Sequence, residues 1–302
     1  MFGYPPLSDK KGRKLYISCR KTRSPKILKN YLNFVTNIAD YLIRKKHKQA
    51  GGNMEFPSPL TQAVLLKRYK RFLAEIVINN QEHRVIYCPN MGAMTGCDIL
   101  GSRVWFSRSP NTRRKFPDTW ELVEVDAGYL VCVNTLNTNQ LILEGIVNGV
   151  INELQGYTQI LLDPPLLEDH SFDILLEKNP GIIDDTEKCF VVSKGVTLGD
   201  EIHRGFFPDT PTEKGVQQLK ALIHAKEMGY RAVLIYCIQH TGIERVFPAD
   251  HIDPKYGSTL RQAMMAGVEM MAYRLDISLS EMHLATPVEV CIPARMICSS
   301  RL

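Results

Sequence analysis

Two apolar runs between residues 160 and 198 constrain the fold of this chain most strongly, because each of them contains one charged residue. The runs are Phe172–Leu176 and Cys189–Leu198. Both are rich in β-branched and aromatic residues and are bounded by turn signals, so we predict two neighbouring strands. Asp173 interrupts the first run and Lys194 the second. A carboxylate and an ammonium group buried in adjacent strands are costly unless they are paired or bind a ligand.

Together with Asp163, these residues predict a nuclease-like site. Metal-dependent cleavage of a phosphodiester needs hard oxygen ligands and a lysine that positions the attacking water. Asp163 and Asp173 are the candidate ligands of Mg²⁺ or Mn²⁺, and Lys194 is the candidate lysine. An acid two positions before the lysine would share its strand face, but Val192 stands there. The alternative is a simple ion pair between Asp173 and Lys194, which this stretch alone favours because ion-pair networks are commoner than catalytic sites.

Charge is divided unevenly along the chain. Residues 1–53 carry 13 lysines and arginines against two aspartates, a net charge of +11, whereas residues 54–302 carry 24 basic and 30 acidic residues, a net charge of −6. We expect residues 1–53 to be a basic extension that is not part of the native fold, and we favour translated sequence upstream of a true start at Met54. A transit-like presequence, or an arm that binds nucleic acid or lipid, is the alternative.

Several classes of protein find no support. The eight cysteines are scattered and none forms a Cys-x-x-Cys pair, which indicates reduced thiols and a cytoplasmic protein rather than a disulfide framework or a zinc site. No apolar run approaches the roughly 20 residues of a membrane span, so we expect no membrane partner. The chain lacks the phosphate-binding Gly-Lys-Ser/Thr loop and the Gly-x-Ser-x-Gly elbow, which leaves NTPase and α/β-hydrolase functions without support.

The pattern of elements predicts two domains. Residues 54–145 contain short strand-like segments separated by turns, which indicates a small OB-like β-barrel; the segments are 64–66, 71–78, 85–88, 103–107, 119–125 and 130–133. Residues 146–302 alternate between strands and helices and predict an α/β domain followed by a C-terminal tail. Its expected strands are 158–162, 172–177, 189–197, 231–239 and 268–275, and its expected helices are 212–228 and 256–265.

Two basic clusters in the barrel region predict contacts to phosphates. Their members are Lys67, Arg68, Lys70, Arg71, Arg103, Arg113, Arg114 and Lys115. Aromatic residues interleave the second cluster and could stack on bases: Trp105, Phe106, Phe116 and Trp120. Composition supports equally a solvated loop beside a packed aromatic core.

The helix expected after Pro211 supplies one more candidate for the nuclease-like site. Lys214, Gln217 and Gln218 share a helix face at i, i+3 and i+4 spacing, and Gln217 is the candidate to orient water or phosphate. An exposed helix face is the alternative that the pattern alone favours.

Eight segments, in order and with the right spacing between about Met54 and Tyr273, resemble the sugar fermentation stimulation protein A (SfsA) family. They are Lys67–Ala74, Cys88–Cys97, Lys115–Leu122, Val133–Thr135, Glu153–Tyr157, Phe207–Asp209, Thr212–Gly215 and Ile252–Tyr256. The resemblance implies an OB-like domain followed by a domain similar to PD-(D/E)xK nucleases. It also implies sequence-independent DNA binding and a regulatory role in sugar metabolism, notably that of maltose.

The chain departs from the family pattern at the nuclease-like site. Family members usually carry Glu-Val-Lys where this chain has Val192-Ser193-Lys194, and Arg where it has Ser171. Because Mg²⁺ needs negative ligands, we expect a DNA-binding protein with weak or no nuclease activity. A Mg²⁺- or Mn²⁺-dependent nuclease acting on DNA or RNA is the alternative, and rescue by Glu177 or Glu187 stays open. The sequence also leaves open a homodimer and a small-molecule effector.

Overall fold

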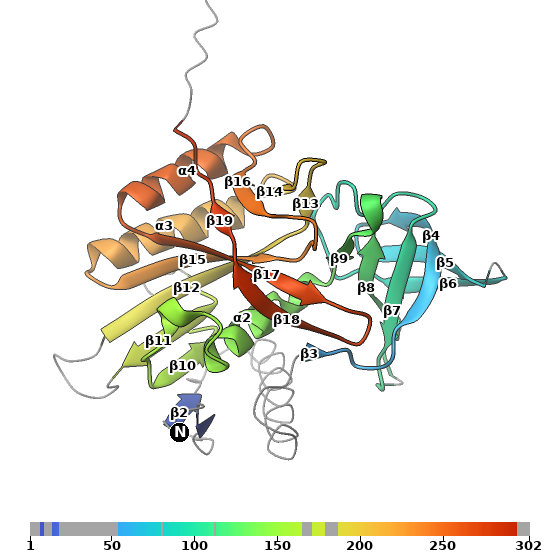
Figure 1. Ribbon diagram of the computed structural model, residues 1–302, viewed down its shortest axis with the longest axis horizontal. Helices are drawn as coiled ribbons and strands as arrows, with labels where there is room; N and C mark the ends of the chain where they lie inside the picture. The colour runs from blue at the N-terminus through green and yellow to red at the C-terminus, as the bar shows by residue number, and fades with distance from the viewer. Residues whose placement is uncertain are drawn as a thin grey trace, which may run out of the picture.

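The computed structural model describes residues 7–8, 14–17, 54–79, 81–111, 113–164, 171–178 and 187–294. It shows a β-barrel beside a larger mixed α/β domain (Figure 1). The expected α+β architecture, with an OB-like barrel first, is therefore confirmed. The basic extension expected at residues 1–53 lies outside the described residues, apart from two short strands.

The barrel is built from consecutive antiparallel strands and closed by one parallel pair. Its strands are β4 (Thr61–Tyr69), β5 (Leu73–Ile78), β6 (Glu82–Tyr87), β7 (Arg103–Arg108), β8 (Asp118–Glu124) and β9 (Leu130–Cys132). They pair in the order β6-β5-β4-β7-β8-β9. Tyr87 of β6 also pairs in parallel with Thr119 of β8, so strands β4 to β8 form a closed five-stranded barrel of the OB type.

The aromatic side chains beside the second basic cluster are mostly buried. Trp105, Phe106 and Trp120 are buried, and Trp120 donates a hydrogen bond from Nε1 to the Leu122 carbonyl over 2.9 Å. The suggestion that these three rings stack on bases is therefore wrong, because packing removes their surface from water. Phe106 and Trp120 pack inside the barrel, whereas Trp105 packs in the core that the barrel shares with α2 and the large sheet. Phe116 is the one member of that set with a partly exposed ring.

The second domain is organised around a nine-stranded mixed sheet in the order β1-β2-β10-β11-β12-β15-β17-β18-β3. Its strands are β1 (Leu7–Ser8), β2 (Lys14–Ile17), β3 (Met54–Glu55), β10 (Gln159–Leu162), β11 (Ile174–Lys178), β12 (Glu187–Val196), β15 (Arg231–Ile238), β17 (Glu269–Ile277) and β18 (Glu281–Pro287). The expected strands in this half all occur, and β18 and β3 extend the sheet beyond them.

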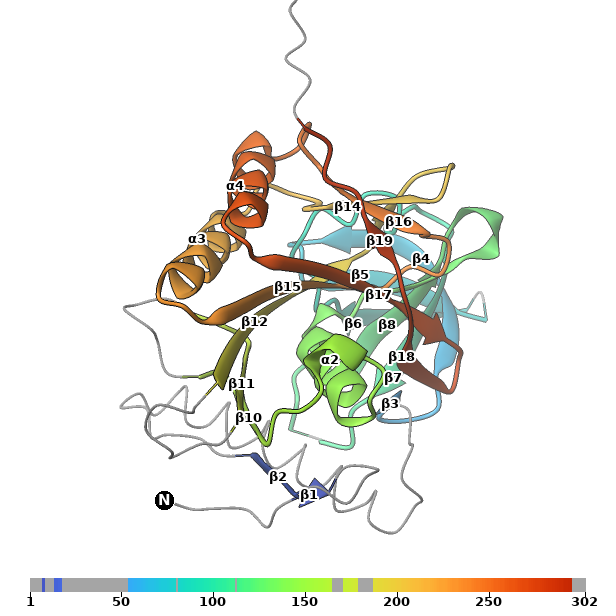
Figure 2. The same cartoon turned by 60° about the vertical axis from the view of Figure 1, so that its left-hand side comes forward.

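In the described part of the chain, three helices cover the two faces of this sheet. Helices α3 (Glu213–Glu227) and α4 (Pro254–Met265) lie on one face, and α2 (Thr138–Val147) lies on the other (Figure 2). Helix α3 connects β12 to the parallel strand β15, and α4 connects β15 to the parallel strand β17. Both helices begin where their caps predict: Thr212 Oγ1 accepts from Gly215 N over 3.0 Å, and Asp253 accepts from Tyr256 N over 2.9 Å.

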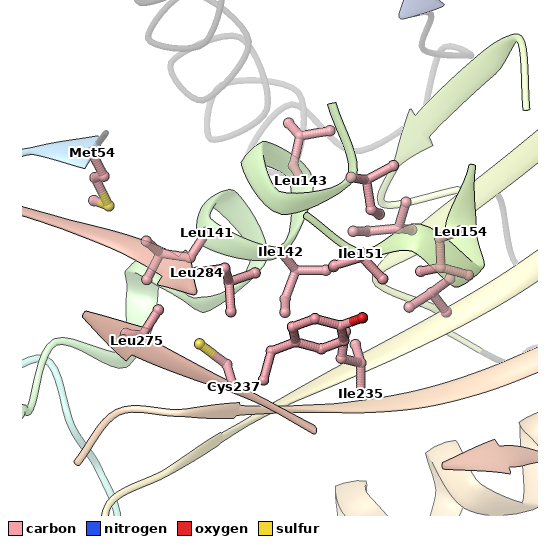
Figure 3. Packing of buried hydrophobic residues seen from close by; sticks show 14 of the residues in the cluster. Met54, Leu141, Ile142, Leu143, Ile151, Leu154, Ile235, Cys237, Leu275 and Leu284 are labelled. Carbon is pink, nitrogen blue, oxygen red and sulfur yellow. The ribbon is translucent and has the colours of Figure 1, made fainter. Parts of the chain in front are cut away.

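Alternation along the central strands creates a separate core on each face. In β12, Cys189 and Val191 pack towards α2, whereas Phe190 and Val192 pack towards α3 and α4. On the α2 face, side chains of the helix cover sheet residues such as Ile235 and Cys237 (Figure 3). The strands read as nearly continuous apolar runs because both faces are buried.

A small second sheet and a junction between the domains were not visible in the sequence pattern. The small sheet has the order β13-β14-β16-β19, from Leu198–Gly199, Arg204–Phe207, Arg245–Pro248 and Glu289–Val290. At the junction, the Cys132 amide donates to the Gln239 carbonyl over 2.8 Å and the Thr241 amide donates to the Leu130 carbonyl over 3.0 Å. Barrel strand β9 is thus continued by backbone pairing into the second domain.

Among the described residues, no helix has the length and apolar character needed to cross a bilayer.

Candidate functional site

A cavity of about 690 Å³ lies between the two domains. The barrel contributes the loop at Asn90–Gly92. The second domain contributes Thr135 to Asn139 at the start of α2, the end of β12, the segment 206–212 and the first turns of α3. Four charged side chains line it: Asp173, Lys194, Asp209 and Lys214.

The pairing of β11 with β12 brings Asp173 and Lys194 to this cavity. Ile174 pairs with Val191, so Asp173, just before β11, lies opposite Val192. Asp173 Oδ2 accepts a hydrogen bond from the Ser193 amide over 2.8 Å. Lys194 shares the face of Val192, and its Nζ donates to Gln218 Oε1. Asp173 and Lys194, both within the described residues, form no direct ion pair. The ion pair that the sequence offered as the alternative is therefore absent, and each side chain has another partner.

Asp163 lies beside Asp173 across the end of the β10–β11 pair. Its amide donates to the Asp173 carbonyl over 3.0 Å, and its backbone has a positive φ of 44°. Burial raises the pKa of Asp163, and the nearby charge of Asp173 raises that pKa further. The structure therefore places Asp163 beside Asp173 and Asp173 near Lys194, although Asp163 does not line the cavity itself.

Lys194 is held in an environment that disfavours its charge. Burial lowers its pKa to about 8, and the positive charge of Lys214 acts in the same direction. Asp173 opposes this shift by favouring the ammonium form. A lysine with this balance can take up or release a proton near neutral pH, which an exposed lysine does not do.

The glutamine beside the lysine is not the one that the pattern singled out. Gln217 is exposed and does not line the cavity, whereas Gln218 is 2% exposed and accepts the Lys194 hydrogen bond. Lys214 and Gln218 share a helix face at i, i+4 spacing. The sequence marked both glutamines as neighbours of this face, but only packing against β12 decides which of them points inward.

Arg68, one of the predicted phosphate contacts, instead forms hydrogen bonds within the barrel domain. Its side chain is 7% exposed. It donates to the carbonyls of Arg71 (3.1 Å), Asn90 (2.9 Å), Gly92 (2.8 Å) and Ala93 (3.1 Å). A guanidinium with its donors used in this way is not available to DNA, because it satisfies carbonyls that would otherwise lack partners.

The loop that Arg68 holds forms the barrel's wall of the cavity. The Met94 amide donates to Asp209 Oδ2 over 3.1 Å. Gly92 lies so close to this carboxylate that a Cβ there would stand 2.3 Å from Oδ2. Arg68 therefore positions the loop, and the loop in turn positions Asn90 and Met91 at the cavity.

The other predicted DNA contacts lie on the surface in two groups. Lys67 pairs with Glu75 over 3.0 Å, and Arg103 pairs with Glu124, so their charges are already offset. Five remain exposed: Lys70, Arg71, Arg113, Arg114 and Lys115. In the second group, Arg114 lies 5.9 Å over the Tyr87 ring and Lys115 5.6 Å over the Phe116 ring, so cations and partly exposed aromatic rings occur together as the sequence suggested.

The carboxylates at the cavity do not fit a divalent ion well. Among the described residues, no group of three or more His, Cys, Asp or Glu side chains could hold a metal. Val192 is fully buried against the helices. Glu177 pairs with Lys188 over 3.5 Å and Glu187 pairs with Lys178 over 3.0 Å. Both acids lie at the far end of the β11–β12 hairpin, so neither supplies the missing ligand.

Both domains match models of known protein families. The model of the sugar fermentation stimulation protein RE domain matches residues 136–281, and that of the SfsA N-terminal OB domain matches residues 66–133. The chain belongs to the sugar fermentation stimulation protein family. A homolog from Marinomonas sp. (strain MWYL1) is 44% identical over 240 residues, which cover 80% of this SfsA chain and 91% of the homolog.

A solved structure supports the fold. The structure of Pyrococcus furiosus SfsA in complex with Ca²⁺ matches with a TM-score of 0.70 and 24% identity, over 80% of this SfsA chain and 100% of the archaeal one. At this identity the match concerns the arrangement of the two domains alone.

The position of Arg68 makes a prediction about stability. Changing Arg68 to Ala in this SfsA chain should lower the free energy of unfolding by roughly 2–4 kcal/mol, because several carbonyls lose a charged donor. The matched control, Arg71→Ala, removes an exposed arginine three residues away and should change it by no more than about 0.5 kcal/mol. Urea unfolding followed by circular dichroism measures both. Equal effects of the two changes would contradict this structural role of Arg68.

The lowered pKa of Lys194 predicts how stability depends on pH. The pKa is about 8 in the folded protein and 10.5 in a free side chain. Between these values the unfolded chain binds the extra proton, so this lysine should make the folded state more stable as pH rises. From about pH 7.5 to about pH 9.5, the free energy of unfolding of the wild type should gain roughly 1 kcal/mol relative to Lys194→Met, after allowance for solvent screening. Urea unfolding at several pH values measures the free energy of unfolding of both proteins. Parallel pH profiles of the wild type and Lys194→Met would refute this prediction.

Proposed function

We propose that this chain is a sequence-independent DNA-binding protein whose second domain keeps a nuclease-like pocket that has lost its cutting activity. The observation that carries the proposal is the arrangement of Asp163, Asp173 and Lys194 at one end of the β10–β11–β12 hairpins, with Val192 opposite Asp173. Phosphodiester chemistry needs this acid and lysine set together with a third negative ligand. A chain that keeps the lysine and lacks the third acid can still bind a phosphate.

DNA contacts are assigned to the exposed cations of the barrel. Exposed cations can neutralise phosphates of any sequence, and cations beside partly exposed rings suit a surface that follows the nucleic-acid backbone. Each phosphate contact releases condensed counterions, so affinity should fall steeply with salt. Arg68 is left out of this surface because its guanidinium is engaged by buried carbonyls, and Lys67 and Arg103 are left out because carboxylates offset their charges at the surface.

The cellular setting is part of the same proposal. All six cysteines that the structure describes are free thiols, which suits a reducing compartment, so we place the protein in the cytoplasm. The name of the Marinomonas relative, a sugar fermentation stimulation protein homolog, supports a role in the regulation of sugar metabolism, and we propose maltose metabolism in particular.

The alternative function is a nuclease that uses Mg²⁺ or Mn²⁺. The approach of Asp163 to Asp173 and the complex of the archaeal relative with Ca²⁺ favour it. The environment of Val192 and the hydrogen bond from Ser193 to Asp173 argue against it, because they leave too few free carboxylate oxygens. Cleavage of DNA or RNA by the wild type in either metal, abolished by Lys194→Ala, would establish the nuclease and refute the degenerate site.

The DNA surface predicts a specific response to mutation. Changing Arg113, Arg114 and Lys115 together to Ala should weaken binding about tenfold or more for every duplex sequence tested, and should reduce the slope of log affinity against log salt by about 2 to 3. The measurement is fluorescence anisotropy on unrelated duplexes over a range of salt. A triple change at Lys178, Lys188 and Lys220, which lie outside the barrel, is the control. Unchanged, salt-insensitive binding would show that this surface is wrong.

Restoring the missing acid predicts a gain of metal binding. Val192→Glu should lower thermal stability without metal, because a buried carboxylate is costly, and should regain part of it when Mn²⁺ is added. Val191→Glu is the matched control, since that residue is equally buried but faces α2. The wild type and the control should show no rise in melting temperature with Mn²⁺. A rise in the control as large as that in Val192→Glu would contradict the assignment of the site.

A further inference from the structure

We propose that the cavity between the domains binds one nucleoside monophosphate unit, supplied either as a free nucleotide or as the end of a single strand. The proposal rests on the DNA-binding function above and names the part of the nucleic acid that enters the pocket. The cavity volume of about 690 Å³ lies within the range of about 300–1,000 Å³ that small-ligand sites show. A paired and stacked base cannot be placed between protein walls, so the unit must be unpaired.

Two lysines give the cavity a side suited to phosphate. Lys194 lies at the inner wall and Lys214 is exposed in the first turn of α3. They are close enough for the charge of Lys214 to disfavour that of Lys194, and an anion between them would relieve this repulsion. The two acids of the lining, Asp173 and Asp209, each already accept a hydrogen bond from a backbone amide. Their negative charge is therefore partly offset, whereas a phosphate would gain charge-assisted bonds from the lysines.

Apolar groups line the same cavity and suit a base. Phe206 is partly buried, and Arg204 lies 5.4 Å over its ring. Met91 and Leu136 are large apolar side chains that are 54% and 65% exposed, although both belong to the lining. Exposed apolar side chains gathered at a cavity indicate a ligand with apolar faces. A base offers such faces and stacks on a ring without regard to sequence.

Two asparagines supply oriented donors. Asn90 Oδ1 accepts from the Gly92 amide over 2.8 Å, and Asn139 Oδ1 accepts from Ser193 Oγ. Because each oxygen is engaged in this way, the amide NH₂ groups are the parts left to meet a ligand. They match the carbonyl and ring-nitrogen acceptors of a base. The lining thus combines cations, an aromatic face and amide donors, which are the three kinds of group that a nucleoside monophosphate needs.

The test compares three probes by fluorescence anisotropy at fixed salt. They are a 5′-phosphorylated single strand of about 12 nucleotides, the blunt duplex of the same sequence, and deoxyadenosine 5′-monophosphate as an unlabelled competitor. Lys214→Ala should weaken binding of the single strand and of the nucleotide about tenfold, because one charge-assisted contact is lost, and should change duplex binding much less. Lys220→Ala is the matched control, since Lys220 is exposed on the same helix and does not line the cavity.

A second variant tests the base contact. Asn139→Asp keeps an acceptor for the Ser193 hydroxyl and removes the amide donor, so it should weaken binding of the single strand and of the nucleotide while duplex binding persists. Thermal melting monitored by circular dichroism confirms that each variant is folded.

The outcomes separate this proposal from the proposed function. Preference for the single strand, displacement by the nucleotide and a selective loss in Lys214→Ala support the pocket assignment. A rise in melting temperature with the nucleotide, without binding of either strand probe, supports the same chemistry with a free nucleotide as its source. Equal binding of single strand and duplex, with no displacement by the nucleotide, overturns the pocket assignment and leaves DNA binding intact. Absence of binding to all three probes overturns both.

Discussion

The backbone pairing between β11 and β12 is the constraint on which the site depends. The Asp173 amide donates to the Val191 carbonyl over 3.1 Å, and the Ser193 amide donates back to the Asp173 side chain over 2.8 Å. This exchange fixes Asp173 at the end of the hairpin and sets Lys194 on the face of β12 that α3 covers. A slip of one residue would send Lys194 into the opposite core, where it would have neither Gln218 nor the cavity.

The second constraint is the contact between the domains. Barrel strand β9 continues by backbone pairing to Gln239 and Thr241, while the loop held by Arg68 meets Asp209. Because both contacts use backbone groups, the barrel has a defined position against the second domain. The two domains together therefore supply the walls of the cavity. Arg68 stabilises this arrangement from a distance, which is why its charge serves the fold rather than a ligand.

Val192 is the residue on which the choice between a phosphate-binding site and a metal-dependent nuclease site depends. Its side chain continues the apolar run Phe190–Val192 into the core below α3 and α4, and this burial is favourable where a carboxylate would be costly. In the function that we propose, valine occupies the position of a third acidic ligand, while the lysine of the set is still present. A cavity with two lysines and few free carboxylate oxygens favours an anion over a divalent ion, which is why we propose phosphate binding rather than cleavage.

Much of this protein was determined by local pattern. The central strands, helices α3 and α4 with their caps, the barrel and the pairing of Asp173 with the neighbourhood of Lys194 could all be predicted, because alternation, helical spacing and turn residues act within a few positions of the chain. Local pattern could not predict which side chains are exposed and free to bind a ligand. Arg68 looks like its neighbour Arg71, Gln217 like Gln218, and Trp120 like a ring beside a basic loop. Only the tertiary structure buried one member of each pair and placed Trp120 inside the barrel, because burial depends on segments that are distant in sequence and come together only when the sheets close.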